Sequence, residues 1–442
     1  MPGYHVSQGR VFFDSGGGQE REEGYSMRRC ARRLARPLGR AASVWLLLAC
    51  LGSPLLAANV VHRDIPTGIR ALNSNATSTH FMRHMWITSD GFIALVVQQG
   101  GLDGHYLVLY ESRDGGLTWQ PVLDIAPDAS LISDGLMDSH DNILLVTSAM
   151  SDDTLDNAES SDVRFVAVLR DQLSGQWSIG TDNLIFEHDA SSFGTRATIA
   201  RSPQGTLGCA MRVGDSAART WYIGLFHSQD GGTTWTRSPE TLGTINKQAQ
   251  KNPRLLWLGD DPAVVYQDAQ MIGTQLRRYK RFAIKTSASP TWQISDVALM
   301  ESNAADPLGT HWSAAVDSGN KIHVSYEDGP DGHGIKYAQF DYGTRKWKAP
   351  FVIATRGTYS NVSVSGNGVV TFVRDDEQET GKRLLGRTVQ DTKWRSISAE
   401  TWWGRMRLSS PERYGNYLPV LHSTSDGGTQ HLIYNLLAVD EP

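Results

Sequence analysis

A seven-bladed β-propeller, an all-β ring of four-stranded sheets, is the fold that three features of the sequence predict. The first is an octapeptide turn that occurs twice, as "SRDGGLTW" at 112–119 and "SQDGGTTW" at 228–235. The second is a series of regularly spaced tryptophans, and the third is a series of hairpins that interleaves with it. Four strands in each unit of about 40–60 residues are typical of propeller blades.

The tryptophans set the period of the repeat. Asp-Gly-Gly between apolar runs favours a tight turn, because glycine tolerates positive φ and aspartate bonds nearby backbone amides. The tryptophan that follows the turn enters the next strand and packs. Such tryptophans lie at steps of 58, 58, 57, 55 and 47 residues, at Trp119, Trp177, Trp235, Trp292, Trp347 and Trp394.

The hairpins supply the inner strands of the blades. Each has a short strand, a turn of Gly, Asp or Asn, and a run of β-formers, which is the usual sequence pattern of a hairpin. They lie at 86–97, 136–148, 198–211, 255–266, 314–326, 362–373 and 419–434. Little chain follows the seventh, so we expect the segment 58–72 to complete the last blade and close the ring. A six-bladed ring is the alternative. Residues 59–442 are predicted to form one domain.

The N-terminal segment is predicted to lie outside the fold. Residues 27–58 combine arginines, an apolar core at 41–51 and small residues near Ala57, which is the layout of a secretory signal. Residues 1–26 are interpreted as an upstream extension. The apolar core is too short for a membrane span. These features predict a periplasmic or secreted bacterial protein, and "LLAC" at 47–50 leaves lipid attachment at Cys50 as an alternative.

Composition excludes several classes of function. A net charge of −5 argues against a dedicated nucleic-acid binder. The acidic run at 151–162 lacks the glycine and the spacing of a calcium loop, so neither a metal nor a cofactor is expected. After loss of the signal, Cys209 is the one remaining cysteine, and we predict a small buried side chain there. We expect a monomer.

Candidate site residues follow from propeller geometry, since the loop that enters each innermost strand points into the mouth of the central channel. The residues just before the predicted inner strands are Arg83, His84, Asp134, Arg196, Asn252, Arg254, His311, Tyr359, Arg413 and Tyr417. Arginine binds a carboxylate through two parallel hydrogen bonds. An acidic oligo- or polysaccharide is therefore the expected partner.

The two octapeptides resemble the Asp-box (BNR) repeats of the sialidase superfamily of β-propellers. That resemblance implies glycoside hydrolysis in which arginines clamp a sialic-acid carboxylate, an Asp serves as acid and base, and a Tyr attacks the sugar. The corresponding residues would be Arg83, Arg196 and either Arg254 or Arg413 for the clamp, Asp134 for the acid and base, and Tyr359 or Tyr417 for the nucleophile.

Two alternatives remain open. The segment "THWSAAVDSGNKIHVSYED" at 310–328 resembles an inner hairpin of the BNR-type polysaccharide lyases, such as those that act on ulvan. In that reading Arg196 neutralises a uronate carboxylate, and the base and acid come from His84 or His311 and from Tyr359 or Tyr417. The second alternative is a propeller without catalytic activity that binds a glycan or a protein at the same mouth.

Overall fold

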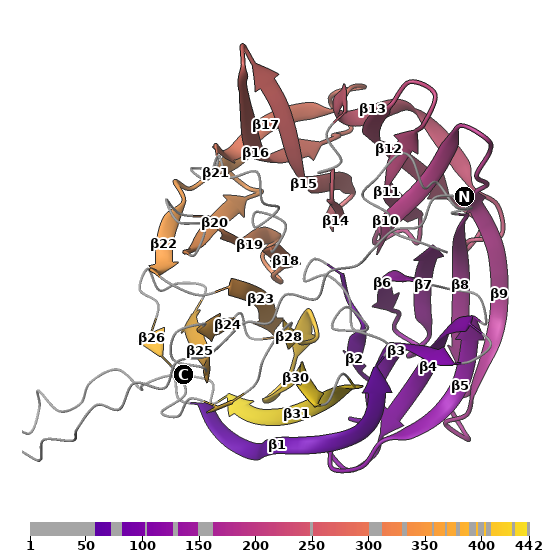
Figure 1. Ribbon diagram of the computed structural model, residues 1–442, viewed down its shortest axis with the longest axis vertical. Coiled ribbons are helices and arrows are strands. Elements are labelled where there is room, and N and C mark those ends of the chain that lie inside the picture. Colours follow the sequence, from indigo (N-terminus) through magenta and orange to yellow (C-terminus); the bar gives the residue numbers. More distant parts are fainter. Residues whose placement is uncertain are drawn as a thin grey trace, which may run out of the picture. The chain divides into compact units, whose positions relative to one another are not determined.

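The structure is a computed structural model, and its described part is an all-β propeller. It describes residues 58–71, 82–101, 104–126, 131–148, 162–247, 251–299, 312–328, 334–355, 358–366, 369–376, 381–388, 395–396, 402–403, 408–426 and 429–439. All of them belong to one compact unit, Pro54–Pro442. The described strands pair into seven sheets (Figure 1). Within this part of the chain no helix is long and apolar enough to cross a membrane.

The first four sheets each contain four strands that pair in chain order. Sheet 1 has β2 (Met85–Ile87), β3 (Ile93–Gly101), β4 (Gly104–Ser112) and β5 (Gln120–Ala126). Sheet 2 has β6 (Leu131–Met137), β7 (Ile143–Ser148), β8 (Val163–Arg170) and β9 (Trp177–Phe186). Sheet 3 has β10 (Ser192–Arg201), β11 (Leu207–Asp215), β12 (Thr220–Ser228) and β13 (Thr236–Asn246). Sheet 4 has β14 (Pro253–Leu258), β15 (Asp261–Ile272), β16 (Gln275–Ile284) and β17 (Gln293–Leu299).

The last three sheets are less regular. Sheet 5 has β18 (Trp312–Val316), β19 (Lys321–Glu327), β20 (Ile335–Asp341), β21 (Lys346–Trp347) and β22 (Phe351–Ala354). Sheet 6 has β23 (Thr358–Ser365), β24 (Val369–Asp376), β25 (Gly381–Thr388), β26 (Arg395–Ser396), β27 (Trp402–Trp403) and β29 (Arg413–Tyr414). Sheet 7 runs in the order β1 (Ala58–Ala71), β31 (Thr429–Val439), β30 (Tyr417–Asp426) and β28 (Leu408–Ser409).

The chain closes the ring with its two ends, as the sequence predicts. Strand β1 pairs antiparallel with β31 from Ala58 opposite Val439 to Ala71 opposite Gln430. Buried hydrophobic clusters join sheet 7 to sheet 1 and each sheet to the next as far as sheet 6. Sheet 6 is joined to the segment that follows β28 of sheet 7 by the Ser363 hydroxyl, which donates a hydrogen bond to the carbonyl of Pro411 and accepts one from the hydroxyl of Ser410. No sheet edge in this cycle faces an open end of the stack.

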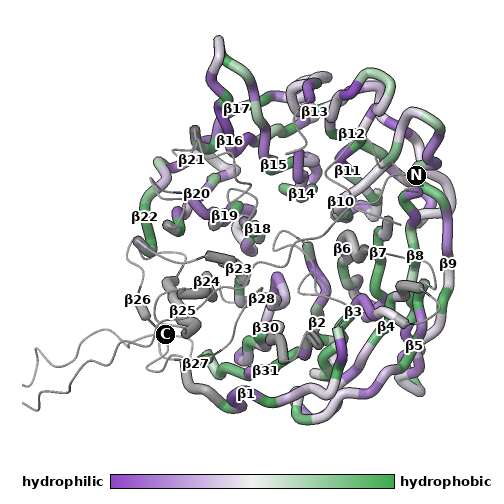
Figure 2. Tube along the Cα trace, viewed as in Figure 1, coloured by the Kyte–Doolittle hydropathy of each residue, from purple (hydrophilic) through white to green (hydrophobic). Residues whose placement is uncertain are grey.

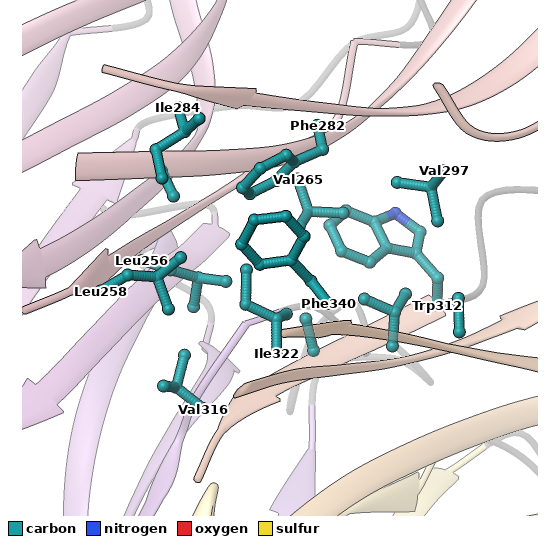
Figure 3. Packing of buried hydrophobic residues seen from close by; sticks show 14 of the residues in the cluster. Leu256, Leu258, Val265, Phe282, Ile284, Val297, Trp312, Val316, Ile322 and Phe340 are labelled. Carbon is teal, nitrogen blue, oxygen red and sulfur yellow. The ribbon is translucent and has the colours of Figure 1, made fainter. Parts of the chain in front are cut away.

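Burial follows the position of a strand in its sheet. The second strands β7 and β11 are buried almost throughout, whereas the outer strand β9 is exposed or half-buried except at its two ends. Figure 2 shows the same contrast as hydrophobic colour along β7 and mixed colour along β9. Between sheets 4 and 5, Phe282, Phe340 and Trp312 fill the interface with aliphatic side chains (Figure 3). This packing buries apolar area between neighbouring sheets, which is the main source of their stability.

The tryptophan period is confirmed where the structure describes it. Each marker lies within one residue of the start of an outer strand, at Trp119, Trp177, Trp235, Trp292 and Trp347. Trp394 lies outside the described residues. Cys209 is buried in β11, as predicted.

The seventh predicted hairpin is wrong in its position within the sheet. Its strands β30 and β31 are the two middle strands of sheet 7, because β28 pairs with the inner side of β30. The segment Leu408–Tyr414 takes the innermost place, with β28 on sheet 7 and β29 parallel to β23 of sheet 6. This segment contains Ser409, Ser410, Pro411 and Glu412 rather than a run of β-formers, so periodicity could not identify it.

The first octapeptide turn is held by its own side chains. The Asp114 carboxylate accepts hydrogen bonds from the backbone N–H of Thr118, at 2.9 Å, and from its hydroxyl, at 2.6 Å. The Ser112 hydroxyl donates to the same carboxylate and accepts from Gly116 N at 2.8 Å. The Trp119 Nε1–H donates to the Gly116 carbonyl. The aspartate is thus committed to the turn and is structural.

The second turn, at 228–235, repeats these bonds and shows what the repeat does. Ser228, Asp230 and Thr234 make the same contacts as their counterparts. The ring of Trp235 lies 5.6 Å from that of Phe165 in sheet 2, and the ring of Trp119 lies 5.6 Å from that of Tyr434 in sheet 7. Each turn therefore fixes its own sheet against the preceding one.

We expect Gly232→Ala to destabilise the protein by about 1–3 kcal/mol, since a Cβ there would overlap the ring of Phe165. The matched control is Gly231→Ala. Gly231 also has a left-handed φ, of 72°, but nothing lies within 4 Å of its Cβ position. Urea unfolding of both variants separates the contact from backbone strain. Equal losses of unfolding free energy in the two variants would show that Gly232 is not needed to leave room for the ring of Phe165.

Candidate functional site at the channel

The central channel has two ends. The inner strands of a propeller run in one direction along the channel. We call the end at which they begin the mouth end, and the end at which they finish the base end. Residues 72–81, 127–130, 248–250 and 300–311, which precede inner strands along the chain, lie outside the described residues.

Inner strands carry bulges near the mouth end. The pairing register shifts between Ile132 and Asp134 in β6, and between Thr195 and Thr198 in β10. Strand β23 has a third shift, after Thr358. Arg196 lies within the bulge of β10 and has a φ of 52°, which is a left-handed conformation that arginine rarely adopts. Bulges redirect side chains and are common beside active sites, so Arg196 is the strongest functional candidate at this end.

Two buried polar atoms lie at the same level as Arg196. Leu255 N donates to Thr198 Oγ1 at 3.0 Å, which aligns β14 with β10. Thr195 and Asn252 each lie three residues toward the mouth end from that contact. Within the described part of the chain, Thr195 Oγ1 and Asn252 Oδ1 are buried and have no hydrogen-bond partner. Buried polar groups are normally bonded, so these two oxygens can each accept a further hydrogen bond.

The predicted ring residues Arg83, Asp134 and Arg254 do come together, but as a closed ion network with Glu412. Arg83 donates from Nη2 to Asp134 at 2.9 Å and from Nη1 to Glu412 at 3.0 Å. Arg254 donates to the same two carboxylates at 2.9 and 2.8 Å. Ile199 N also donates to Asp134, at 3.0 Å. The quartet of Arg83, Asp134, Arg254 and Glu412 therefore crosses the channel and links sheets 1, 2, 3 and 4 to the segment Leu408–Tyr414.

The quartet does not fit the chemistry predicted for its members. Burial by itself raises the pKa of the Asp134 carboxyl, but the guanidinium groups of Arg254 and Arg83 and the hydrogen bonds hold it below its usual range. Asp134 is fully buried and ionised at neutral pH, so it does not serve as a proton donor. Arg83 and Arg254 are neutralised by Asp134 and Glu412, so neither is free to clamp a substrate carboxylate.

His84 is buried beside the quartet. Burial, together with the positive charges of Arg254 and Arg83, lowers the pKa of His84 to about 3. The imidazole is therefore neutral at pH 7 and is enclosed by protein. A base has to reach the proton that it removes, which argues against His84 as the catalytic base.

We expect His84 to make the fold sensitive to acid. Its folded-state pKa of about 3 lies below the unfolded value of about 6.5, so the unfolded chain binds the extra proton between these pH values. Its contribution to stability is complete above about pH 6.5 and is lost as the pH falls toward 3. The free energy of unfolding in urea, measured at pH 7 and pH 5, should depend less on pH in His84→Gln. His140→Gln, a substitution of an exposed histidine, is the control and should keep the pH dependence of the parent. An unchanged pH dependence of the unfolding free energy in His84→Gln would contradict this assignment.

Two predicted site residues lie elsewhere. Tyr417 begins β30, the second strand of sheet 7, and is 53% exposed. It follows the end of the inner segment Leu408–Tyr414 and therefore lies at the base end. The sequence predicts it at the mouth because β30 is taken there as an inner strand, whereas β30 is the second strand of its sheet. Arg413 is exposed and also lies at the base end of that segment. His311 lies outside the described residues, and of Tyr359 the structure describes the backbone in β23.

Glu412 is the functional side chain that sequence reasoning missed. It accepts hydrogen bonds from both arginines of the quartet, 329 and 158 residues away in sequence. The two residues Pro411 and Glu412 interrupt any strand pattern, so no periodicity marked the position as central. The one sequence feature that could have identified Glu412 is its position next to Arg413, which is itself a predicted substrate-binding residue.

A cavity lies on the base side of the quartet. It has a volume of about 620 Å³. Its walls are the last residues of the inner strands and the turns that follow, among them Trp86, Arg201, Trp257 and Arg413. On the mouth side of the quartet the described residues leave a void of about 10 Å³, which holds no more than one water. No group of three or more metal-binding side chains occurs in the described ranges.

Comparisons with known proteins give a fold and no family. No protein-family model matches the chain, and no curated protein matches its sequence. Among solved structures, the polysaccharide lyase Uly1 is similar at 8% identity and a TM-score of 0.52, over 87% of this chain and 99% of that one. This likeness extends over nearly the whole of both chains and is one of fold.

Two other solved structures are similar at lower TM-scores. The α-L-arabinofuranosidase Arb93A from Fusarium graminearum is 13% identical, with a TM-score of 0.43 over 85% of this chain and 98% of that one. The Hadza microbial sialidase Hz136 is 14% identical, with a TM-score of 0.44 over 70% of this chain and 65% of that one. The paired sheets described above and the likeness to Uly1 both indicate a β-propeller fold.

Proposed function

We propose that the protein is a carbohydrate-active propeller that cleaves a uronate-containing glycan by β-elimination at the mouth end of its channel. The observation that carries this proposal is Arg196, held at a left-handed φ in a bulge of β10. At the same level lie the unpartnered oxygens of Thr195 and Asn252. An arginine and two polar oxygens at one level of the channel suit a sugar that carries both a carboxylate and hydroxyl groups.

The elimination needs three groups. Arg196 would pair with the uronate carboxylate and so acidify the proton on the adjacent carbon. A base removes that proton, the double bond forms as the glycosidic oxygen leaves, and an acid protonates this oxygen. We assign the base and the acid to His311 and Tyr359, since His84 is enclosed by protein and Tyr417 belongs to the base end.

Sialidase-like hydrolysis is the weaker alternative. It calls for several arginines on one carboxylate and for an Asp that exchanges a proton. Arg83 and Arg254 are already paired with Asp134 and Glu412, and the pKa of Asp134 lies below its usual range. One arginine is enough for a lyase, and Arg196 is not part of the quartet.

We also propose the finer features of the architecture. Each of the seven sheets would be one blade, with the octapeptide turns as Asp-box repeats on the outside of the ring. A six-bladed ring is the alternative, and an experimentally determined structure would decide by the number of sheets that line the channel. The region 59–442 would act as a monomer outside the cytoplasm after removal of residues 27–58.

The experiment that tests the function is a panel of glycans incubated with purified protein. The panel contains ulvan, polygalacturonate, heparan sulfate, a sialylated oligosaccharide and neutral arabinan. β-Elimination creates an unsaturated uronate that absorbs near 230 nm, so absorbance should rise with at least one uronate polymer. Release of sialic acid would support the hydrolase instead. Binding of a glycan without any product would support a propeller that binds but does not cleave.

A further inference from the structure

We propose that the base cavity, the cavity of about 620 Å³ on the base side of the quartet, is a second binding site, for a small carboxylate-bearing ligand of the size of a sugar acid. Its volume lies within the range of about 300–1,000 Å³ that is typical of small-molecule sites. The inner strands of several sheets contribute to its walls. This inference is independent of the function proposed for the mouth end.

The charge of the base cavity favours an anion. Its charged side chains are Arg83, Arg201 and Arg413 against Asp138 and Glu412. Glu412 is bonded by both arginines of the quartet. Arg413 is exposed, and among the described residues the negative charge that it interacts with is that of Glu412, which both arginines of the quartet already bond. One positive charge therefore remains for a ligand.

Asp138 does not compete for Arg413, because its carboxylate is committed to its own turn. Oδ1 accepts from His140 N at 2.8 Å and from Asn142 N at 2.9 Å. Oδ2 accepts from the Asn142 amide at 3.1 Å and lies 3.8 Å from Arg201. Arg201 has a side chain that is 42% exposed and keeps donors for a second contact. Arg413 and Arg201 are thus the two cations that a carboxylate in the base cavity would meet.

Two indoles, Trp86 and Trp257, form part of the apolar walls, beside aliphatic side chains such as Leu136 and Leu256. Trp86 lies over Gly135, where any side chain would overlap the indole ring. Trp257 lies near the end of β14 and packs against the cluster between sheets 3 and 4. Neither indole N–H has an acceptor in the described part of the chain. Aromatic walls with a few cationic groups are the arrangement expected for a sugar acid rather than for an inorganic ion.

The quartet separates the base cavity from the mouth end. Arg83 and Glu412 border both the base cavity and the void of about 10 Å³ on the other side. That void holds no more than one water, and the hydrogen-bonded side chains of the quartet lie beside it. The two ends are therefore distinct sites on one chain, and variants can disable them one at a time.

The test is calorimetric titration of the full chain with D-glucuronate, and with D-glucose as the uncharged match. The measurement is made in Arg196→Gln, so that the arginine of the mouth end cannot contribute. We expect one glucuronate per chain to bind and glucose to bind far more weakly. Adding Arg413→Gln should weaken glucuronate binding by about tenfold or more, as expected when a charged hydrogen bond is lost. Arg237→Gln, an exposed substitution on the outer strand β13, should leave it unchanged.

Three results would overturn the proposal: no binding of glucuronate to Arg196→Gln, equal binding of glucose, or binding that survives Arg413→Gln unchanged. None of these depends on turnover of a glycan. The absence of a lyase product would overturn the function proposed for the mouth end and leave this site in place. Loss of glucuronate binding when Arg413→Gln is added to Arg196→Gln, with turnover intact in the single variant Arg413→Gln, would support two separate sites.

Discussion

Asp134→Asn should lower the free energy of unfolding by about 3–5 kcal/mol, because removing one partner of a buried ion network leaves uncompensated charge. Asp134 is fully buried and accepts hydrogen bonds from Arg83, Arg254 and the backbone N–H of Ile199. An amide in its place keeps one acceptor, but its NH₂ group would face these donors. Urea unfolding at pH 7 measures the loss.

The matched control is Asp182→Asn. Asp182 pairs with Arg164 at 2.8 Å, but both side chains are more than two-fifths exposed, and such pairs contribute about 0–1 kcal/mol. The pKa of Asp134 lies below its unfolded value, so its contribution is complete above about pH 4 and is lost as the pH falls further. The difference between Asp134→Asn and the parent should shrink in acid. Equal effects of the two substitutions would show that the quartet is not a buried network.

Arg196→Gln should lower kcat/KM on a uronate glycan by about 10²–10³-fold, which is the usual cost of removing one donor that stabilises developing negative charge. Arg196→Lys keeps the charge but loses the planar fork, and we expect a loss of about tenfold or more. Stability should change little in either variant if the strained backbone is retained. Initial rates at 230 nm, measured with unfolding curves, separate activity from folding.

Arg201→Gln at the base end is the control for this series. Arg201 lies on β10, as Arg196 does, but it is the last residue of the strand and lies on the opposite side of the quartet. Its substitution should leave turnover unchanged. If Arg201→Gln abolishes activity while Arg196→Gln does not, the glycan is cleaved at the base end and the assignment of the mouth end is wrong.

Much of the fold could be predicted because the chain repeats a strong local signal. Tryptophans at the start of the outer strands and hairpins with left-handed turn residues, such as Gly91 and Asn320, fix the sheets from sequence alone. The pairing of β1 with β31 also followed, from the chain left over at the two ends. The last sheet was misassigned because its innermost segment, Leu408–Tyr414, is held by Glu412 and serine hydrogen bonds instead of a strand pattern.

The candidate site was harder to predict because its chemistry depends on partners far apart in the chain. The sequence placed Arg83, Asp134 and Arg254 together in the channel, and they do lie there. It could not show that two carboxylates neutralise both arginines, since Arg254 is 120 residues from Asp134 and 158 residues from Glu412. The left-handed φ of Arg196 is likewise invisible in the sequence, because it arises from the bulge that β10 forms against β11.

The most direct test of the central claim, that a uronate glycan is cleaved by β-elimination at the mouth end, compares two forms of one polymer. The first is the uronate glycan that gives the strongest signal in the panel, and the second is the same polymer after chemical reduction of its carboxyl groups. We predict that the parent protein produces absorbance near 230 nm with the first form and none with the second, and that Arg196→Gln loses most of the signal while remaining folded. Cleavage of the reduced polymer, or full activity in Arg196→Gln, would contradict the account.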